Sequence, residues 1–335
     1  MFLVALGFLV SLRHMMLAEI SLRTPHVHQT PGLAGIYFGK VFKFIDFGVV
    51  FIGGLGSLLV YIIAQGEVLS AIFGGSTFIW SLAFFAIGSF LIYFGLSVVK
   101  RSELVMTAVM FLITLLIGVM SWDKIDVSNF FVAGEGDWTL TFGVLLFAYT
   151  GAVAIPEMRR ELEGKEKEFP RALIFGSLAI FIVYMLFTFL VVGVTGQGTT
   201  EVGTIGLGER IGPRMILIGN LLAFFTMGTS FLTGGLGLRD MFRFDFHYPN
   251  LVAWLIVVLA PLIVFLLGAR DFISIVGFLG GVLGSLQTIV IVLTYWQARR
   301  TGWRTPEFSL GPMKVAGALI ILIFALGLLF SLGAV

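Results

Sequence analysis

The 335-residue chain is much more apolar than a water-soluble domain, with 58% hydrophobic and 12% charged residues, whereas soluble domains carry about 25% charge. Its net charge of +2 is too small to indicate a nucleic-acid partner, and the lack of cysteine excludes disulfides, thiolate nucleophiles and cysteine metal sites. Apolar stretches of about 18 residues or more recur throughout, each long enough to cross a bilayer core of about 30 Å. The sequence therefore predicts an all-α polytopic membrane protein whose main partner is the lipid bilayer.

Ten membrane spans are predicted in chain order, joined by short loops within one domain that covers residues 1–335. They lie at roughly 1–18, 44–66, 76–99, 104–121, 139–157, 170–194, 212–236, 250–268, 272–296 and 313–335. Lys and Arg concentrate on the cytoplasmic side of membrane proteins. Because 17 of the 21 Lys and Arg residues fall on one set of loops and loop edges, the segment 159–171 is predicted to be cytoplasmic and 122–138 external.

The first span resembles a membrane helix more than a signal peptide. No basic residue precedes its apolar run, and no small-x-small cleavage site follows. The sequence SLRHMMLAEISLRT at residues 11–24 looks more like a helix that runs into a cytoplasmic loop. The charge rule nevertheless places Met1 outside. We therefore expect this span to be a second helix whose predecessor is absent from this chain.

The span 139–157 contains the weakest helical sequence of the chain, FAYTGAVAIP at residues 147–156. Glycine and proline both weaken the helical hydrogen-bond ladder. In hydrocarbon a broken helix persists only where it lines a cavity or is buried in protein, and secondary transporters bind substrates and ions at such breaks. The sequence predicts a break near mid-membrane, with a kink that only shapes packing as the alternative.

Residues 142–196 resemble the sixth and seventh helices of the amino acid/auxin permease group, which includes bacterial aromatic amino acid permeases and belongs to the amino acid–polyamine–organocation superfamily. The resemblance rests on the pattern F-x-x-x-G-x-x-x-x-P-E from Phe147 to Glu157, the charged loop after it, and PRA at 170–172. Residues 15–25, 60–70 and 224–240 resemble parts of that group's second, third and eighth helices.

The resemblance implies an inverted five-helix-repeat transporter architecture missing its first helix. Residues 1–121 would be the remnant of the first repeat, 139–296 the second repeat, and 313–335 an extra C-terminal helix. The implied function is secondary active transport of amino acids, aromatic or neutral, across the cell membrane by alternating access, coupled to Na⁺ or H⁺. The implied substrate-binding residues are Phe147, Ala148, Tyr149, Thr150 and Gly151 at the break, with Tyr61 from the third helix.

A coupling-cation site is implied at Thr226, Thr229 and Ser230, whose hydroxyls share one helical face. Hard cations take such oxygen ligands, although Ser and Thr in membrane helices also bond to their own i−4 carbonyls. Some proton-coupled relatives use a lysine on the fifth helix, and the span 104–121 contains none. No cofactor or metal is predicted apart from Na⁺ as a possible coupling ion.

Few ionisable residues are predicted to lie in the membrane: Arg13, His14, Glu19 and Glu157. Glu19 and Arg23 are spaced to pair at i, i+4, and Asp46 is expected at a helix start. The charged run from 157 to 161 is either a gate of exchanging ion pairs or, as we expect, a solvated loop. No catalytic motif is present, so the alternatives to transport are an amino-acid-sensing receptor subunit and an inactive fragment.

Overall fold

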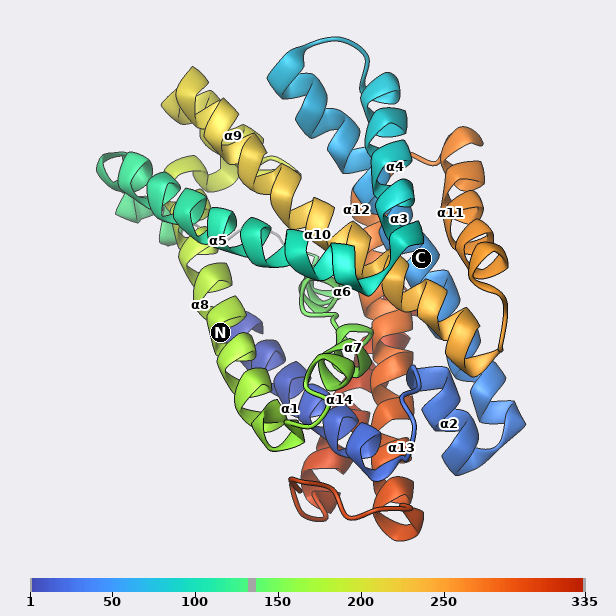
Figure 1. The fold of residues 1–335 in the computed structure, drawn as a ribbon. Helices are drawn as coiled ribbons and strands as arrows, with labels where there is room; N and C mark the ends of the chain where they lie inside the picture. Colours follow the sequence, from blue (N-terminus) through green and yellow to red (C-terminus); the bar gives the residue numbers. More distant parts are fainter. Residues whose placement is uncertain (1, 132–136, 334–335) are drawn as a thin grey trace.

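The computed structural model describes residues 2–131 and 137–333, and the side chains of these residues except for 96–104 and 106. Part of the predicted external segment 122–138 and the outermost residues of the chain therefore lie outside the described residues. Every regular element in the described part is helical (Figure 1). This confirms the predicted fold class, an all-α polytopic membrane protein.

Eight helical segments of the described part are long and apolar enough to cross a membrane. They are Phe2–Arg23, Lys40–Phe73, Thr77–Phe94, Thr107–Lys124, Glu166–Gly198, Pro213–Asp245, Phe272–Thr301 and Lys314–Gly333. Each overlaps a predicted span. The two other predicted spans correspond to shorter helices: 139–157 to α6 (Trp138–Ala148) and α7 (Ala154–Glu161), and 250–268 to α11 (Asn250–Leu266).

The long helices surround the short pair α6 and α7, which lies at the centre of the view in Figure 1. The eight long segments correspond to the helices α1 (Phe2–Arg23), α3 (Lys40–Phe73), α4 (Thr77–Phe94), α5 (Leu96–Ser121), α8 (Phe169–Thr195), α10 (Pro213–Asp245), α12 (Phe272–Phe278), α13 (Ser285–Thr301) and α14 (Lys314–Gly333). A π-helical turn, η5 (Leu279–Gly284), joins α12 to α13. Many apolar side chains on the outer helices are exposed, as expected for contact with lipid.

Two short helices lie in segments predicted to be loops, α2 (Thr30–Phe38) and α9 (Gly203–Ile211). α2 has a proline in its first turn and packs against α3 and α13. It ends at Gly39, whose φ of 85° favours glycine and lets one residue turn the chain into α3. Both helices are too short to produce a membrane-span signal, so the apolar pattern misses them.

The predicted helix start at Asp46 is wrong. α3 begins at Lys40, so Asp46 lies almost two turns inside the helix, and its side chain is fully buried. The basic, mixed sequence at 40–43 concealed this extension, because a membrane-span pattern detects the apolar part of a helix and not its polar ends.

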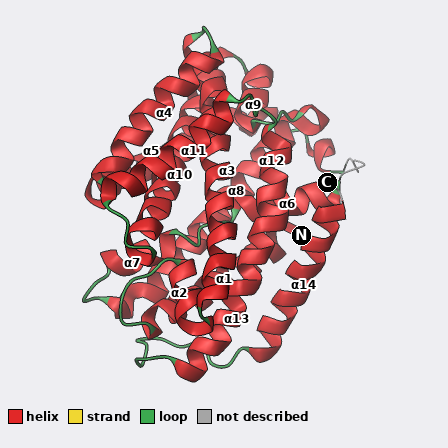
Figure 2. Cartoon of the chain, turned by 90° about the vertical axis from the view of Figure 1, so that its right-hand side faces the viewer, coloured by secondary structure: helices red, strands yellow, loops and turns green. Residues whose placement is uncertain are grey.

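Glycines bring α6 into backbone contact with the segment from α12 to η5, and Figure 2 shows α6 and α12 side by side. A β-carbon on Gly143 would lie 2.3 Å from the Gly277 carbonyl oxygen, and one on Gly280 would lie 1.8 Å from the Gly143 carbonyl oxygen. Small residues permit such approaches between membrane helices. The contact holds the end of α6, and therefore the break that follows it, against η5.

Substitution Gly280→Ala is expected to destabilise the protein by about 3 kcal/mol, the upper end of the usual cost of overpacking, because the new methyl group meets backbone that cannot move aside. Gly48→Ala in α3 is the matched control, since a β-carbon there meets nothing within 4 Å. Unfolding in detergent measures both variants. Equal stability of Gly280→Ala and the wild type would contradict the contact.

Candidate functional site at a broken helix

The helix predicted over 139–157 is divided in two, which confirms the predicted break. α6 ends at Ala148 and α7 begins at Ala154. The chain turns where the Thr150 N–H and hydroxyl both donate to the Phe147 carbonyl oxygen, at 3.0 and 2.5 Å. Pro156 lies in the first turn of α7, where its missing N–H is tolerated. The break therefore follows from Gly151 and Pro156 acting together on one span.

The outer end of α6 is fixed by Asp137, which lies outside the spanning segments. Its carboxylate accepts hydrogen bonds from the Thr139 N–H at 2.8 Å and the Leu140 N–H at 3.1 Å. The hydrogen bond from the Thr139 hydroxyl, together with these two backbone donors, lowers the pKa of Asp137 below its usual value. This N-cap sets where α6 starts and hence how deep in the membrane it ends.

The break leaves backbone groups of both polarities unpaired within the described residues. The N–H groups of Gly151, Ala152 and Val153 donate no hydrogen bond, and the carbonyls of Tyr149 and Thr150 accept none. α6 presents its negative C-terminal end to the break and α7 its positive N-terminal end. Donors and acceptors are therefore available side by side at the break.

A cavity of about 350 Å³ opens at the break, between α3, α10 and the segment from η5 to α13. Its lining includes six of the nine predicted site residues: Tyr61, Phe147, Thr150, Gly151, Thr229 and Ser230. The rings of Tyr61 and Phe147 lie side by side in it, tilted by 45° with centroids 6.3 Å apart. Residues from three distant parts of the sequence thus meet in one cavity.

The other three predicted residues do not line this cavity. The Ala148 carbonyl accepts a hydrogen bond of 2.8 Å from the Tyr184 hydroxyl. The Tyr149 ring packs against Tyr184, with centroids 5.3 Å apart, and its hydroxyl is buried. Thr226 donates to the carbonyls of Leu222 and Ala223, at 3.0 and 3.1 Å, inside its own helix. Ala148 and Tyr149 therefore contribute to the break through their backbone and packing.

The hydroxyls of Thr229 and Ser230 both donate to the Thr226 carbonyl oxygen, at 2.9 and 3.0 Å. This is the back-bonding that the sequence left open as the alternative to a cation role. A hydroxyl that donates keeps its own lone pairs. Both residues line the cavity, so this back-bonding does not by itself exclude a cation role.

Some polar groups of the cavity were not predicted. Gln287 on α13 and Ser57 on α3 both line it, as does Thr233, one turn beyond Thr229 on α10. The signal that could have identified Thr233 is its helical spacing from Thr229. Gln287 is a polar residue in a strongly apolar span, which is a recognisable signal in a membrane sequence.

The charged run after the break is not a solvated loop, which corrects that prediction. Glu157 and Arg159 are buried. Arg160 forms ion pairs with Glu157, at 3.1 Å, and with Asp240 of α10. Arg159 donates to backbone carbonyls at the end of α1, including that of Thr24 at 2.9 Å. These contacts anchor α7 to the C-terminal end of α1 and to α10.

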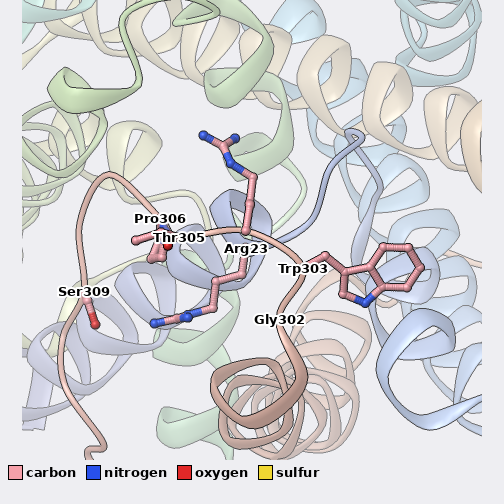
Figure 3. Close-up of a pocket in the computed structure, with 7 residues that line it drawn as sticks. Arg23, Gly302, Trp303, Thr305, Pro306 and Ser309 are labelled. Atoms are coloured by element: carbon pink, nitrogen blue, oxygen red, sulfur yellow. The ribbon is translucent and has the colours of Figure 1, made fainter.

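The predicted pair of Glu19 and Arg23 is confirmed at 2.8 Å, and Arg299 also pairs with Glu19 at 2.5 Å. Beside it lies a second cavity of about 380 Å³, lined by Arg23 and the loop 302–309 (Figure 3). In Figure 3 the Trp303 indole extends away from Ser309. This cavity shares no lining residue with the cavity at the break, and Arg23 and Arg304 are already paired with Glu19 and Glu307.

No curated protein matches the chain. Residues 1–331 match the tryptophan/tyrosine permease family, which is nearly the whole length. Together with eight apolar helices able to span a membrane in the described part, this match defines the function in outline: a multi-pass membrane protein that transports amino acids and is not an enzyme. The chain belongs to the tryptophan/tyrosine permease family.

Proposed function

We propose that the protein is a secondary active transporter that binds an aromatic amino acid at the break between α6 and α7 and carries it across the cell membrane by alternating access. The observation that carries this proposal is the set of unpaired backbone N–H and C=O groups beside a cavity of about 350 Å³. Unpaired backbone groups are costly in a membrane. A ligand with both charges would satisfy them.

A zwitterionic amino acid has the required complementarity. Its carboxylate would accept hydrogen bonds from the N–H groups of residues 151–153, at the positive end of α7. Its ammonium would donate to the carbonyls of Tyr149 and Thr150, at the negative end of α6. An aromatic side chain would pack against the pair of rings formed by Tyr61 and Phe147, whose centroids lie 6.3 Å apart.

The alternating-access mechanism rests on the proposed repeat architecture of the amino acid–polyamine–organocation superfamily. In it, residues 1–121 belong to the first repeat, 139–296 form the second, and 313–335 form an additional helix. The break lies in the first membrane-crossing segment of the second repeat, and α3 of the first repeat contributes Tyr61 to the same cavity. Rocking of one helix group against the other would expose the cavity to each side in turn.

Coupling to a cation is proposed at the hydroxyls of Thr226, Thr229 and Ser230. Thr229 and Ser230 line the cavity, and Thr226 supplies the carbonyl to which both are bonded. Na⁺ would use hydroxyl and carbonyl oxygens as ligands. Coupling to H⁺ would not need this set of oxygen ligands. The two coupling ions are therefore distinguishable by substitution.

Purified protein in proteoliposomes is expected to accumulate labelled tryptophan or tyrosine when a Na⁺ or pH gradient is imposed, and to release it when the gradient is dissipated. With Na⁺ as the coupling ion, the double substitution Thr229→Ala and Ser230→Ala removes two hydroxyl ligands. It should raise the Na⁺ concentration needed for half-maximal uptake by roughly tenfold or more, which corresponds to a loss of at least about 1.4 kcal/mol of binding free energy. With H⁺ as the coupling ion, the same variant should keep its pH dependence.

The result that would contradict the proposal is binding without transport. A thermal shift with tryptophan or tyrosine, combined with no uptake and no exchange of labelled substrate under either gradient, would favour the receptor alternative. Absence of both binding and uptake would remove the break as a substrate site.

A further inference from the structure

Arg13 is a charged residue halfway along an apolar helix, and the proposed transport mechanism assigns it no role. It is the twelfth residue of the 22-residue helix α1, and its side chain is fully buried. At a rise of about 1.5 Å per residue, it lies roughly 15 Å from either end of the helix. A charge at that depth is costly and is retained where it serves function.

No carboxylate within the described residues pairs with Arg13. Its guanidinium donates from Nη1 to the Thr288 hydroxyl at 3.1 Å and contacts His14 Nε2 through Nη2 at 2.7 Å. Its Nε is buried and has no hydrogen-bond partner. The acid nearest along the helix, Glu19, is bonded to Arg23 and Arg299 instead. The positive charge of Arg13 is therefore solvated by neutral groups only.

Both contacts of Arg13 lead to the break and the cavity. A β-carbon on Gly151 would lie 3.7 Å from His14 Cε1, so the imidazole packs directly against the break. The Thr288 hydroxyl donates to the Gly284 carbonyl oxygen at 2.8 Å, and Gly284 lines the cavity. Arg13 thus lies behind the wall that Gly151 and Gly284 present to the substrate.

The His14 ring is placed between the Arg13 guanidinium and the proposed position of the substrate carboxylate. The unpaired N–H groups begin at Gly151, the residue on which His14 packs. Two charges that are separated by one side chain interact strongly when water is excluded from between them. A fixed cation at this place lowers the energy of an anion on the N–H groups of α7 and raises that of a cation beside it.

We propose that Arg13 determines specificity for substrates with a free carboxylate, and that through His14 and Gly151 it orients the amino acid with its carboxylate toward α7. This inference rests on the proposed substrate site and specifies its charge selectivity. Arg13 does not touch the substrate; it is a positioning residue. Amines and amides that share the aromatic side chain but lack the carboxylate are excluded because they bring a net positive charge to the same cavity.

The test is competition against uptake of labelled tryptophan in proteoliposomes, using unlabelled tryptophan, tryptophan amide and tryptamine. The wild type should be inhibited far more strongly by the acid than by the amide or the amine. Arg13→Gln should reduce this acid-to-amide preference by roughly tenfold, the effect of a nearby charge in a partly screened site. Arg13→Lys, which keeps the charge, should restore most of the preference.

Arg171→Gln is the matched control, because this arginine side chain is 74% exposed and its removal changes net charge equally. Its acid-to-amide preference should equal that of the wild type.

If Arg13→Gln does not fold, the wild type and Arg13→Lys still test the proposal, because equal inhibition by tryptophan and tryptophan amide in both proteins would overturn it. A stable Arg13→Gln variant with unchanged preference would show that Arg13 only fixes α1 to α13. Failure of the wild type to transport tryptophan or tyrosine would instead refute the proposed function.

Discussion

Substitution Gly151→Leu is expected to abolish amino acid uptake while leaving the protein folded. The β-carbon direction of Gly151 points at the His14 ring, which lies at ordinary van der Waals distance from a methyl group there. The further atoms of a leucine have no room in that direction. They would displace either His14 or the break, and with it the N–H groups proposed to bind the carboxylate. Uptake in proteoliposomes and elution as a monodisperse species in detergent measure the two effects.

Two further variants make this prediction specific. Gly151→Ala should retain most uptake, because its β-carbon would lie 3.7 Å from His14 Cε1. Gly176→Leu places the same large side chain in α8, where a β-carbon meets nothing within 4 Å, and should transport normally. Normal uptake by Gly151→Leu would mean that the break does not hold the substrate.

Substitution Asp240→Asn is expected to destabilise the protein by about 3–5 kcal/mol, the cost of leaving a buried ion-pair partner without its counter-charge. The Asp240 carboxylate is fully buried and pairs with Arg160 and with Arg239, the latter at 2.9 Å. Arg239 is 2% exposed and also donates to the Ile92 carbonyl at the end of α4, at 2.6 Å. Its charge could not reach water without moving α4 away from α10.

Thermal and denaturant-induced unfolding in detergent measure this loss. Asp123→Asn provides the comparison, because Asp123 is 69% exposed and its pair with Lys124 lies at the surface; its stability should change by less than about 1 kcal/mol. An Asp240→Asn variant as stable as Asp123→Asn would show that the contacts linking α7, α10 and α4 contribute little.

The sequence predicted the break and most of the spans because both depend on local properties. A run of apolar residues is a property of one segment, and Gly151 with Pro156 weakens a helix whatever surrounds it. The same reasoning missed the short helix α2. It also predicted that Glu157 and Arg159 lie in a solvated loop, whereas both are buried. Short helices and buried ion pairs both depend on what packs against them.

Assembly of the candidate site was predictable only in part. The resemblance placed Tyr61, the residues around Gly151 and the hydroxyls of α10 in one site, and six of the nine residues line one cavity. The position of Arg13 beside the break was not predictable, since it depends on how α1 crosses α13. Gln287 of α13, by contrast, could have been singled out as a polar residue in an apolar span, although its place in the cavity depends on helix packing.

The central claim is that an amino acid binds at the break, and the natural lack of cysteine allows a direct test. Thr150→Cys places one thiol at an exposed position in the cavity, and Thr77→Cys places one at an exposed position at the start of α4. Maleimide labelling of each variant is measured with and without tryptophan or tyrosine. Binding at the break predicts that the substrate slows labelling of Thr150→Cys and not of Thr77→Cys; unchanged labelling of a transport-competent Thr150→Cys variant would contradict it.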